Sequence, residues 1–170
     1  MLKYFAYGSN LHPVRLMQRV PESEFLCRAI VPGFRLYFHK RSSDGSGKCN
    51  IFYSGNNDDI VHGAIYQMPV DSQKILDRYE GVGYGYEVQT IEVTSDDQAH
   101  EAFAYVAHQS HIDDLLQPYH WYKELVLRGA EHLDMPEHYI RSIKAIVSIP
   151  DEEQQRRLEN EAILNAISAY

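Results

Sequence analysis

The stretch Lys3-Tyr4-Phe5-Ala6-Tyr7-Gly8-Ser9-Asn10-Leu11 lies near the start of the sequence. Its first five residues alternate and are rich in aromatic side chains, which predicts a β-strand that breaks at Gly8. Pro13 suits the first position of a short helix, and Pro21 stops that helix at about Val20. A strand, a glycine turn and a helix start are therefore expected to follow one another directly.

The next part of the chain is rich in strand-like runs. Alternation and turn composition predict further strands at residues 25–31, 34–40, 50–53, 60–68, 86–94 and 101–108. One helix interrupts them, with Asp71 as its expected cap and Gly81 just past its end. The serine- and glycine-rich segment Arg41–Lys48 is expected to form an irregular loop, and residues 95–98 are expected to form a hairpin turn.

From Tyr119 the periodicity changes, and helices are expected at residues 122–132, 136–147 and 151–168. Strands first and helices last favour an α+β fold. The expected form is an antiparallel-rich, barrel-like mixed sheet with flanking helices concentrated in the C-terminal third. Residues 1–150 would form one domain, and residues 151–170 a C-terminal amphipathic helix extension. Packing of this helix on its own domain is favoured, and a homodimer is the alternative.

Composition excludes several classes of function. A chain of 170 residues can bury one sizeable core. No apolar run approaches the roughly 18–20 residues that span a bilayer, and the first residues are too short and too aromatic for a signal peptide. A cytoplasmic protein without a membrane partner is therefore expected. The net charge of −8 argues against a nucleic-acid partner.

Two local features receive structural interpretations. Four arginines have acids nearby in sequence and are interpreted as parts of solvated helix faces: Arg15, Arg19, Arg156 and Arg157. Cys27 and Cys49 are interpreted as two reduced thiols, because they form no CxxC pair and export is not expected.

The glycine turn at residues 8–11 is the first candidate site. A strand end that leads into a helix leaves backbone N–H groups without intrahelical partners, and such groups can bind an oxyanion or a carboxylate. An ordinary turn capped by Ser9 or Asn10 is the commoner explanation of the same pattern.

Glu80 is the second candidate. It falls at the expected C-terminus of a helix, where the macrodipole disfavours a carboxylate. Burial among tyrosines would disfavour the charge further, which suits a group that must both accept and donate a proton near neutral pH. An exposed glutamate is an equally compatible interpretation.

Other groups of residues are weak evidence for a metal site, a catalytic nucleophile or a nucleotide-binding site. His108 and His111 lack a third ligand nearby, so no metal site is expected. Ser9 lacks a G-x-S-x-G elbow, and neither a P-loop nor a dinucleotide-binding glycine motif occurs.

Three blocks of sequence resemble one family. Tyr4–Leu11 resembles the N-terminal signature of the γ-glutamyl cyclotransferases, and Leu76–Val82 with Gly85-Tyr86 is similar to their catalytic segment. Three further segments of this chain resemble the C-terminal helices of the family, namely Tyr122–Leu125, Gly129-Ala130 and Met135–Ile140. The resemblance spans roughly residues 3–147, and is nearer to enzymes for γ-glutamyl amino acids or amines than to the glutathione-specific branch.

The resemblance implies an activity that needs neither cofactor nor metal. A small γ-glutamyl substrate would cyclise to 5-oxoproline and release its amine, with Glu80 as the acid/base. The substrate would be held by Tyr7, Gly8, Ser9, Asn10 and Leu11, and surrounded by Tyr86, Tyr105 and Tyr122. A non-catalytic module for a small acidic ligand is one alternative. A cyclotransferase for γ-glutamyl amines, or for a γ-glutamyl protecting group in a biosynthetic pathway, is another.

Overall fold

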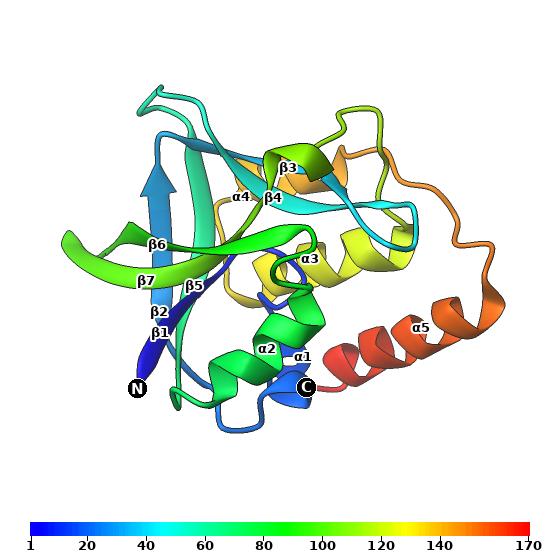
Figure 1. Cartoon of the computed structure of the whole chain (residues 1–170), viewed down its shortest axis with the longest axis horizontal. Helices are drawn as coiled ribbons and strands as arrows, with labels where there is room; N and C mark the ends of the chain where they lie inside the picture. Colours follow the sequence, from blue (N-terminus) through cyan, green and yellow to red (C-terminus); the bar gives the residue numbers. More distant parts are fainter.

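A closed barrel forms the centre of the computed structural model, which describes residues 1–170 (Figure 1). Around the barrel the strands follow the order β1 (Leu2–Ala6), β5 (Ile60–Met68), β2 (Glu24–Pro32), β6 (Tyr86–Ser95) and β7 (Gln98–Ala107). All neighbours are antiparallel except β1 and β7, which pair in parallel at Tyr4 and Phe103 and close the barrel. The expected antiparallel-rich, barrel-like mixed sheet is confirmed.

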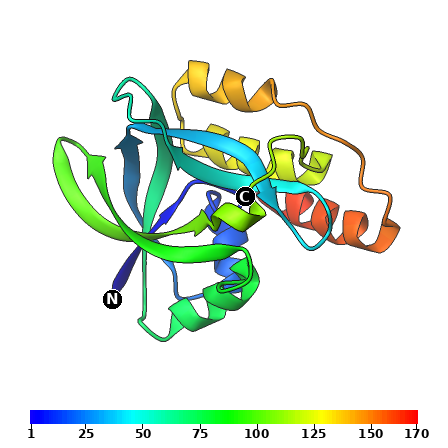
Figure 2. The same cartoon turned by 45° about the horizontal axis from the view of Figure 1, so that its top comes forward.

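Strands β3 (Phe34–Arg41) and β4 (Gly47–Tyr53) form a separate two-stranded ribbon. Figure 2 shows this ribbon leaving the barrel and running across α3 (His120–His132). Both strands extend into the segment that the sequence predicted to be irregular, so the connecting loop is only residues 42–46. Gly47 allows this pairing, because a Cβ there would lie 2.1 Å from the carbonyl oxygen of Phe38.

The β6–β7 hairpin is longer than expected. Asp96 and Asp97 both have positive φ, 46° and 61°, as a two-residue type I′ turn requires. Ser95 therefore pairs directly with Gln98. Strand β7 begins at Gln98 rather than at the expected residue 101, because the turn consumes only the two aspartates.

The remaining helices are α1 (Pro13–Arg19), α2 (Ser72–Glu80), α4 (Glu137–Lys144) and α5 (Gln154–Ser168), with a 3₁₀ turn at Gln109–His111. Helices α3 to α5 occupy the C-terminal third, as expected. Asp71 makes no capping hydrogen bond, whereas Gly81 adopts φ +66° and ends α2 directly after Glu80. No helix has the length and apolar character needed to cross a bilayer, and both cysteines are free thiols.

Helix α5 packs on its own domain, where Leu164 and Ile167 are buried in the common core. The segment before it is anchored by Asp151, whose side chain is fully buried. This carboxylate accepts hydrogen bonds from the indole Nε1 of Trp121 at 2.8 Å and from Nε of Arg156 at 2.7 Å. The interpretation of Arg156 as part of a solvated face was therefore wrong, because its partner is a buried acid.

Arg157 is also engaged, since its Nη1 donates to the backbone carbonyl of Asp151 at 2.8 Å. Helix α5 begins at Gln154 rather than at residue 151, because Glu153 is its cap and accepts from the backbone N–H groups of Gln155 and Arg156. The first residues of the extension therefore anchor it to the domain before the helix starts.

His12 supplies a prediction about stability. Its ring is 2% exposed, its Nδ1 accepts from Val14 N at 3.2 Å, and it lies 4.3 Å from the ring of His132. Burial, and secondly His132, lower the pKa of His12 from 6.5 to about 4. Between about pH 6.5 and pH 4, His12 is therefore protonated in the unfolded chain but neutral in the folded chain. The free energy of unfolding should consequently fall by up to about 3 kcal/mol by pH 4.

Urea unfolding at pH 7 and pH 4.5 measures this effect. His12→Asn is the matched variant, because asparagine retains a capping oxygen but does not titrate. The variant should lose clearly less stability on acidification than the wild type. An equal loss in both proteins would show that His12 is not the group responsible.

Candidate active site

Glu80 lies where the β1–α1 turn meets the C-terminal end of α2. Its Oε1 accepts hydrogen bonds from Asn10 Nδ2 at 2.9 Å and from Arg19 Nη1 at 2.7 Å. The same Arg19 nitrogen also donates to Asn10 Oδ1 at 2.9 Å, so the three side chains close a triangle. The other carboxylate oxygen of Glu80 receives no hydrogen bond from the protein. One oxygen is held in place, and the other remains available to a ligand.

Arg19 corrects the sequence analysis, which placed it on a solvated face. Its side chain is 13% exposed, pairs with Glu80, and its guanidinium lies 5.0 Å from the centroid of the Tyr79 ring. Arg15 is also withdrawn from solvent, and burial lowers its pKa to about 10. The sequence-based view of Glu80 considered only burial and the helix dipole. It did not include the Arg19 guanidinium, which donates a hydrogen bond to Glu80 Oε1.

The predicted row of free N–H groups is present in the turn. Leu11 N donates to Gly8 O at 3.0 Å, whereas the N–H groups of Gly8, Ser9 and Asn10 donate to no acceptor in the protein. These three residues and Glu80 border a recess of about 20 Å³. Such a volume holds roughly one water-sized group, so the recess fits a single oxygen atom.

Tyrosines form most of the remaining recess wall, namely Tyr4, Tyr7, Tyr86, Tyr105 and Tyr122. Tyr105 OH donates to Asp77 Oδ1 at 2.7 Å, and Tyr122 OH accepts from Cys49 N at 3.0 Å. Tyr7 OH donates to the backbone carbonyl of Tyr105, and Tyr86 OH donates to that of Cys49. Burial is the main cause that raises the pKa of each of these phenols. The wall therefore presents fixed, protonated hydroxyls.

Cys49 lies in the same wall but is unsuited to nucleophilic chemistry. Its burial raises the pKa of the thiol to about 12, and the thiolate is the nucleophilic form of cysteine.

Leu11 is the predicted site residue that lies apart from the others. It is fully buried and borders neither the recess nor the adjoining pocket. Its carbonyl accepts from Tyr66 OH at 2.7 Å, and its side chain lies against Gly129 of α3. Leu11 therefore fixes the turn to the core, whereas Tyr7, Gly8, Ser9, Asn10, Glu80, Tyr86, Tyr105 and Tyr122 are brought together.

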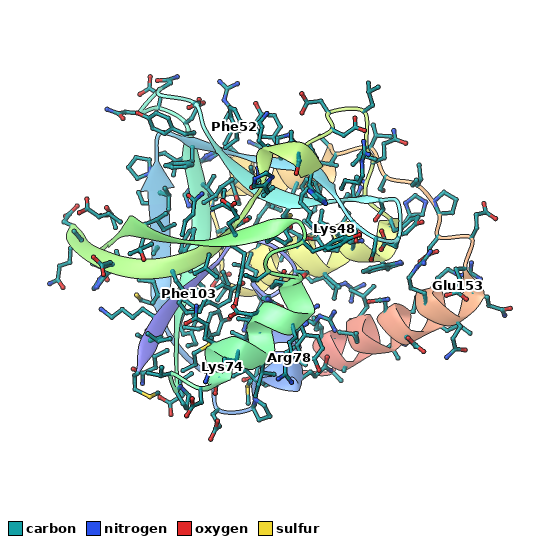
Figure 3. All side chains as sticks on the ribbon, viewed as in Figure 1. Lys48, Phe52, Lys74, Arg78, Phe103 and Glu153 are labelled. Atoms are coloured by element: carbon teal, nitrogen blue, oxygen red, sulfur yellow. The ribbon has the colours of Figure 1, made fainter.

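A larger pocket of about 480 Å³ adjoins the recess, and the two share Ser9, Glu80, Tyr86 and Tyr122. Its basic lining residues are Arg19, Lys40, Arg41, Lys48 and Arg78, and its one acidic lining residue is Glu80. In Figure 3, Lys48 lies on β4 and Arg78 lies on α2. A chain of net charge −8 thus carries a positive pocket, which attracts anionic ligands.

Lys40 and Lys48 were not among the residues that the sequence identified, because Lys40 directly precedes, and Lys48 ends, the segment that was expected to be irregular. Nothing in the local sequence marks them as neighbours of Glu80. His108 and His111, by contrast, both contact Ser110, and no three His, Cys, Asp or Glu side chains gather as a possible metal site.

The arrangement combines a held carboxylate, free N–H groups around an oxygen-sized recess, and a pocket for anions.

A family model described as the AIG2-like family matches residues 60–143. Human γ-glutamylcyclotransferase is 32% identical over 148 residues, or 84% of this chain and 77% of the human protein. The bovine γ-glutamylcyclotransferase is 31% identical over the same shares. A solved structure of a γ-glutamyl cyclotransferase superposes with a TM-score of 0.82 at 27% identity, covering 97% of this chain and 98% of that one. The resemblance seen in the sequence is confirmed, and the chain belongs to the γ-glutamyl cyclotransferase family.

Proposed function

We propose that the protein is a γ-glutamylcyclotransferase, which converts a γ-glutamyl amino acid or amine to 5-oxoproline and releases the amine. The observation that carries the proposal is the position of Glu80, which keeps one oxygen free of hydrogen bonds and borders the same recess as residues 8–10, whose N–H groups have no acceptor. The relatives named γ-glutamylcyclotransferase lend it further support.

The nucleophile in this reaction belongs to the substrate. The α-amine of the glutamyl unit attacks its own γ-carbonyl carbon and closes a five-membered lactam. The enzyme therefore needs no serine or cysteine nucleophile, which agrees with the raised pKa of Cys49. Its first contribution is to hold the bent glutamyl chain with the amine close to the carbonyl, and positioning of this kind can supply several kcal/mol.

Glu80 would carry the proton between the two nitrogens. It first accepts a proton from the α-ammonium group, which frees the lone pair for attack. It then donates that proton to the leaving nitrogen as the old C–N bond breaks. The excess proton that the ring nitrogen still carries passes through Glu80 to the released amine, which leaves as an ammonium ion, and the lactam is neutral. Arg19 and Asn10 hold one oxygen of Glu80, so the other can reach both nitrogens without losing its position.

The recess would hold the oxygen of the tetrahedral intermediate. Negative charge develops on this oxygen during attack. Backbone N–H groups that have no acceptor in the folded protein can stabilise that charge with little reorganisation. The N–H groups of Gly8, Ser9 and Asn10 are the donors available there.

The alternative of a non-catalytic module for a small acidic ligand explains less. The basic lining of the pocket would suit such a ligand. A binding module would not, however, benefit from Glu80, since a carboxylate in that position repels the anion to be bound. The homodimer stays a prediction.

Release of 5-oxoproline from a panel of substrates tests the proposal. The panel contains γ-glutamyl amino acids, γ-glutamyl-ε-lysine, γ-glutamyl amines and glutathione. We expect release from at least one γ-glutamyl amino acid or amine, and weak or no release from glutathione. A folded protein that releases 5-oxoproline from none of them would contradict the assignment.

Arg19→Lys should lower kcat by about tenfold, because lysine keeps the charge but not the planar fork that reaches Glu80 and Asn10 together. Steady-state 5-oxoproline release measures the effect. Arg28→Lys on β2 is the matched control, since Arg28 contacts only backbone carbonyls of residues 133 and 134. Equal activity of both variants would mean that the Arg19 pair does not position Glu80.

A further inference from the structure

Lys40 differs from the other basic residues of the pocket. It is 9% exposed, and its Nζ has neither a hydrogen-bond acceptor nor a salt-bridge partner, whereas Arg19, Arg41 and Lys48 pair with Glu80, Asp113 and Asp44. Arg78 is also unpaired but is exposed. The Lys40 ammonium lies over the face of Tyr86, 4.4 Å from Nζ to the ring centroid. The Lys40 residue is thus largely withdrawn from solvent, and its ammonium lines the pocket without a paired anion.

An ammonium that has lost part of its hydration and has no hydrogen-bonded partner in the protein is unfavourable. Burial accordingly lowers the pKa of Lys40, and the nearby acids Glu80 and Asp44 oppose that effect. An anionic ligand in the pocket would remove the unfavourable term and gain a charge-assisted hydrogen bond.

The surrounding backbone leaves room for this ammonium. A Cβ on Gly85 would lie 2.7 Å from Lys40 Cε and 2.9 Å from its Nζ. Any side chain at residue 85 would therefore force the end of Lys40 to move. The absence of a side chain at this one position keeps the ammonium beside Tyr86 and open to the pocket.

The position of Lys40 relative to the recess indicates which part of a substrate it meets. Lys40 borders the larger pocket and not the recess, while Glu80 and Ser9 border both. If the γ-carbonyl oxygen occupies the recess, which holds a single oxygen atom, the leaving group must extend into the larger pocket. Lys40 borders that pocket and is therefore available to a charge that the leaving group carries.

We propose that Lys40 binds a carboxylate of the leaving group, and that the enzyme thereby prefers γ-glutamyl amino acids to γ-glutamyl amines that carry no negative charge. This inference rests on the proposed function. Lys40 is a specificity-determining residue in it, and Glu80 remains the proton-transferring group.

The test compares two substrates that differ in charge and hardly in shape, γ-glutamyl-alanine and γ-glutamyl-alaninamide. Wild-type kcat/KM should favour the carboxylate by roughly 10- to 100-fold, the range of a hydrogen bond between charged groups. In Lys40→Met this ratio should fall to about threefold or less. Lys74→Met is the charge-matched control, because Lys74 is 77% exposed near the start of α2 (Figure 3). Its ratio should equal that of the wild type.

A second variant moves the charge without removing it. Gly85→Ala should lower the ratio, though less than Lys40→Met, because its Cβ displaces the ammonium. Circular dichroism and the melting temperature establish that each variant is folded.

Binding measured by calorimetry separates failure of the inference from failure of the proposed function. Glu80→Gln is titrated with each compound, alone and combined with Lys40→Met. If no 5-oxoproline is ever released but binding still favours the carboxylate through Lys40, the proposed function fails and the role of Lys40 stands. An equal loss for both compounds in Lys40→Met would place Lys40 on the glutamyl half, and overturn the inference. Absence of binding by both compounds would overturn it as well.

Discussion

Glu80→Gln should lower 5-oxoproline release by about 10³-fold or more and leave the fold intact. Glutamine has nearly the same shape, and its side-chain oxygen can still accept from Arg19 and Asn10. It cannot accept and return a proton, and general acid–base catalysis contributes about 10²–10⁴-fold. Both proton transfers are assigned to this one carboxylate, so the upper part of that range is expected. Steady-state release from the best substrate of the panel, with a melting curve, measures the effect.

Glu92→Gln is the matched control for this variant. Glu92 is exposed on β6 and borders neither the recess nor the pocket, so the same change of charge should leave turnover unaltered. If Glu80→Gln keeps more than about a tenth of the wild-type activity, the proton must travel by another group, since loss of a general acid–base residue lowers rates at least about 100-fold.

Asp151→Ala should lower the free energy of unfolding by about 3 kcal/mol. The substitution leaves the indole N–H of Trp121 buried without an acceptor and removes the partner of Arg156. Breaking a buried ion pair from one side costs about 3–5 kcal/mol, and the lower value is expected because the Arg156 side chain is 31% exposed and can reach water. Urea unfolding at pH 7 measures the difference from the wild type.

The pH dependence of this difference has a definite sign. Hydrogen bonding to Arg156 is the main cause that lowers the pKa of Asp151 below its usual value near 3.8. A lowered pKa contributes stability above the unfolded value and loses it as the pH falls further. The gap between wild type and Asp151→Ala should therefore be full at pH 7 and shrink below about pH 4. Glu152→Ala, an exposed neighbour, should show no such gap, and equal behaviour of the two variants would contradict the anchoring role of Asp151.

The sequence predicted most of the fold because the relevant signals are local. Alternation marks each strand, and Gly81 marks the end of α2, so Glu80 was placed at the helix terminus where the structure has it. Hairpin and cap details shift the boundaries by a few residues only. The catalytic assignment came from resemblance, and barrel closure then brings the turn at residues 8–10 to the end of α2.

Pairings between distant segments could not be predicted in this way. Arg19 and Glu80 are 61 residues apart, and Trp121 and Asp151 are 30 apart. Nothing in the sequence beside Arg19 or Asp151 indicates a partner so far along the chain, and only the path of the chain in three dimensions decides that they meet. Lys40 was missed for the same reason, because its lack of a partner is a property of the packed pocket rather than of the residues beside it.

The separate β3–β4 ribbon has an evolutionary consequence. Lys40 and Lys48 lie on this ribbon, whereas Glu80 and the N–H groups of the turn belong to segments attached to the closed barrel. The ribbon strands pair with each other and, outside the ribbon, only through an isolated bridge between Lys40 and Ile112, so side chains and the connecting loop of the ribbon can diverge while the barrel registers stay unchanged. If Lys40 selects the leaving amine as proposed, descendants of one ancestral protein can acquire different amine preferences through changes in a short hairpin.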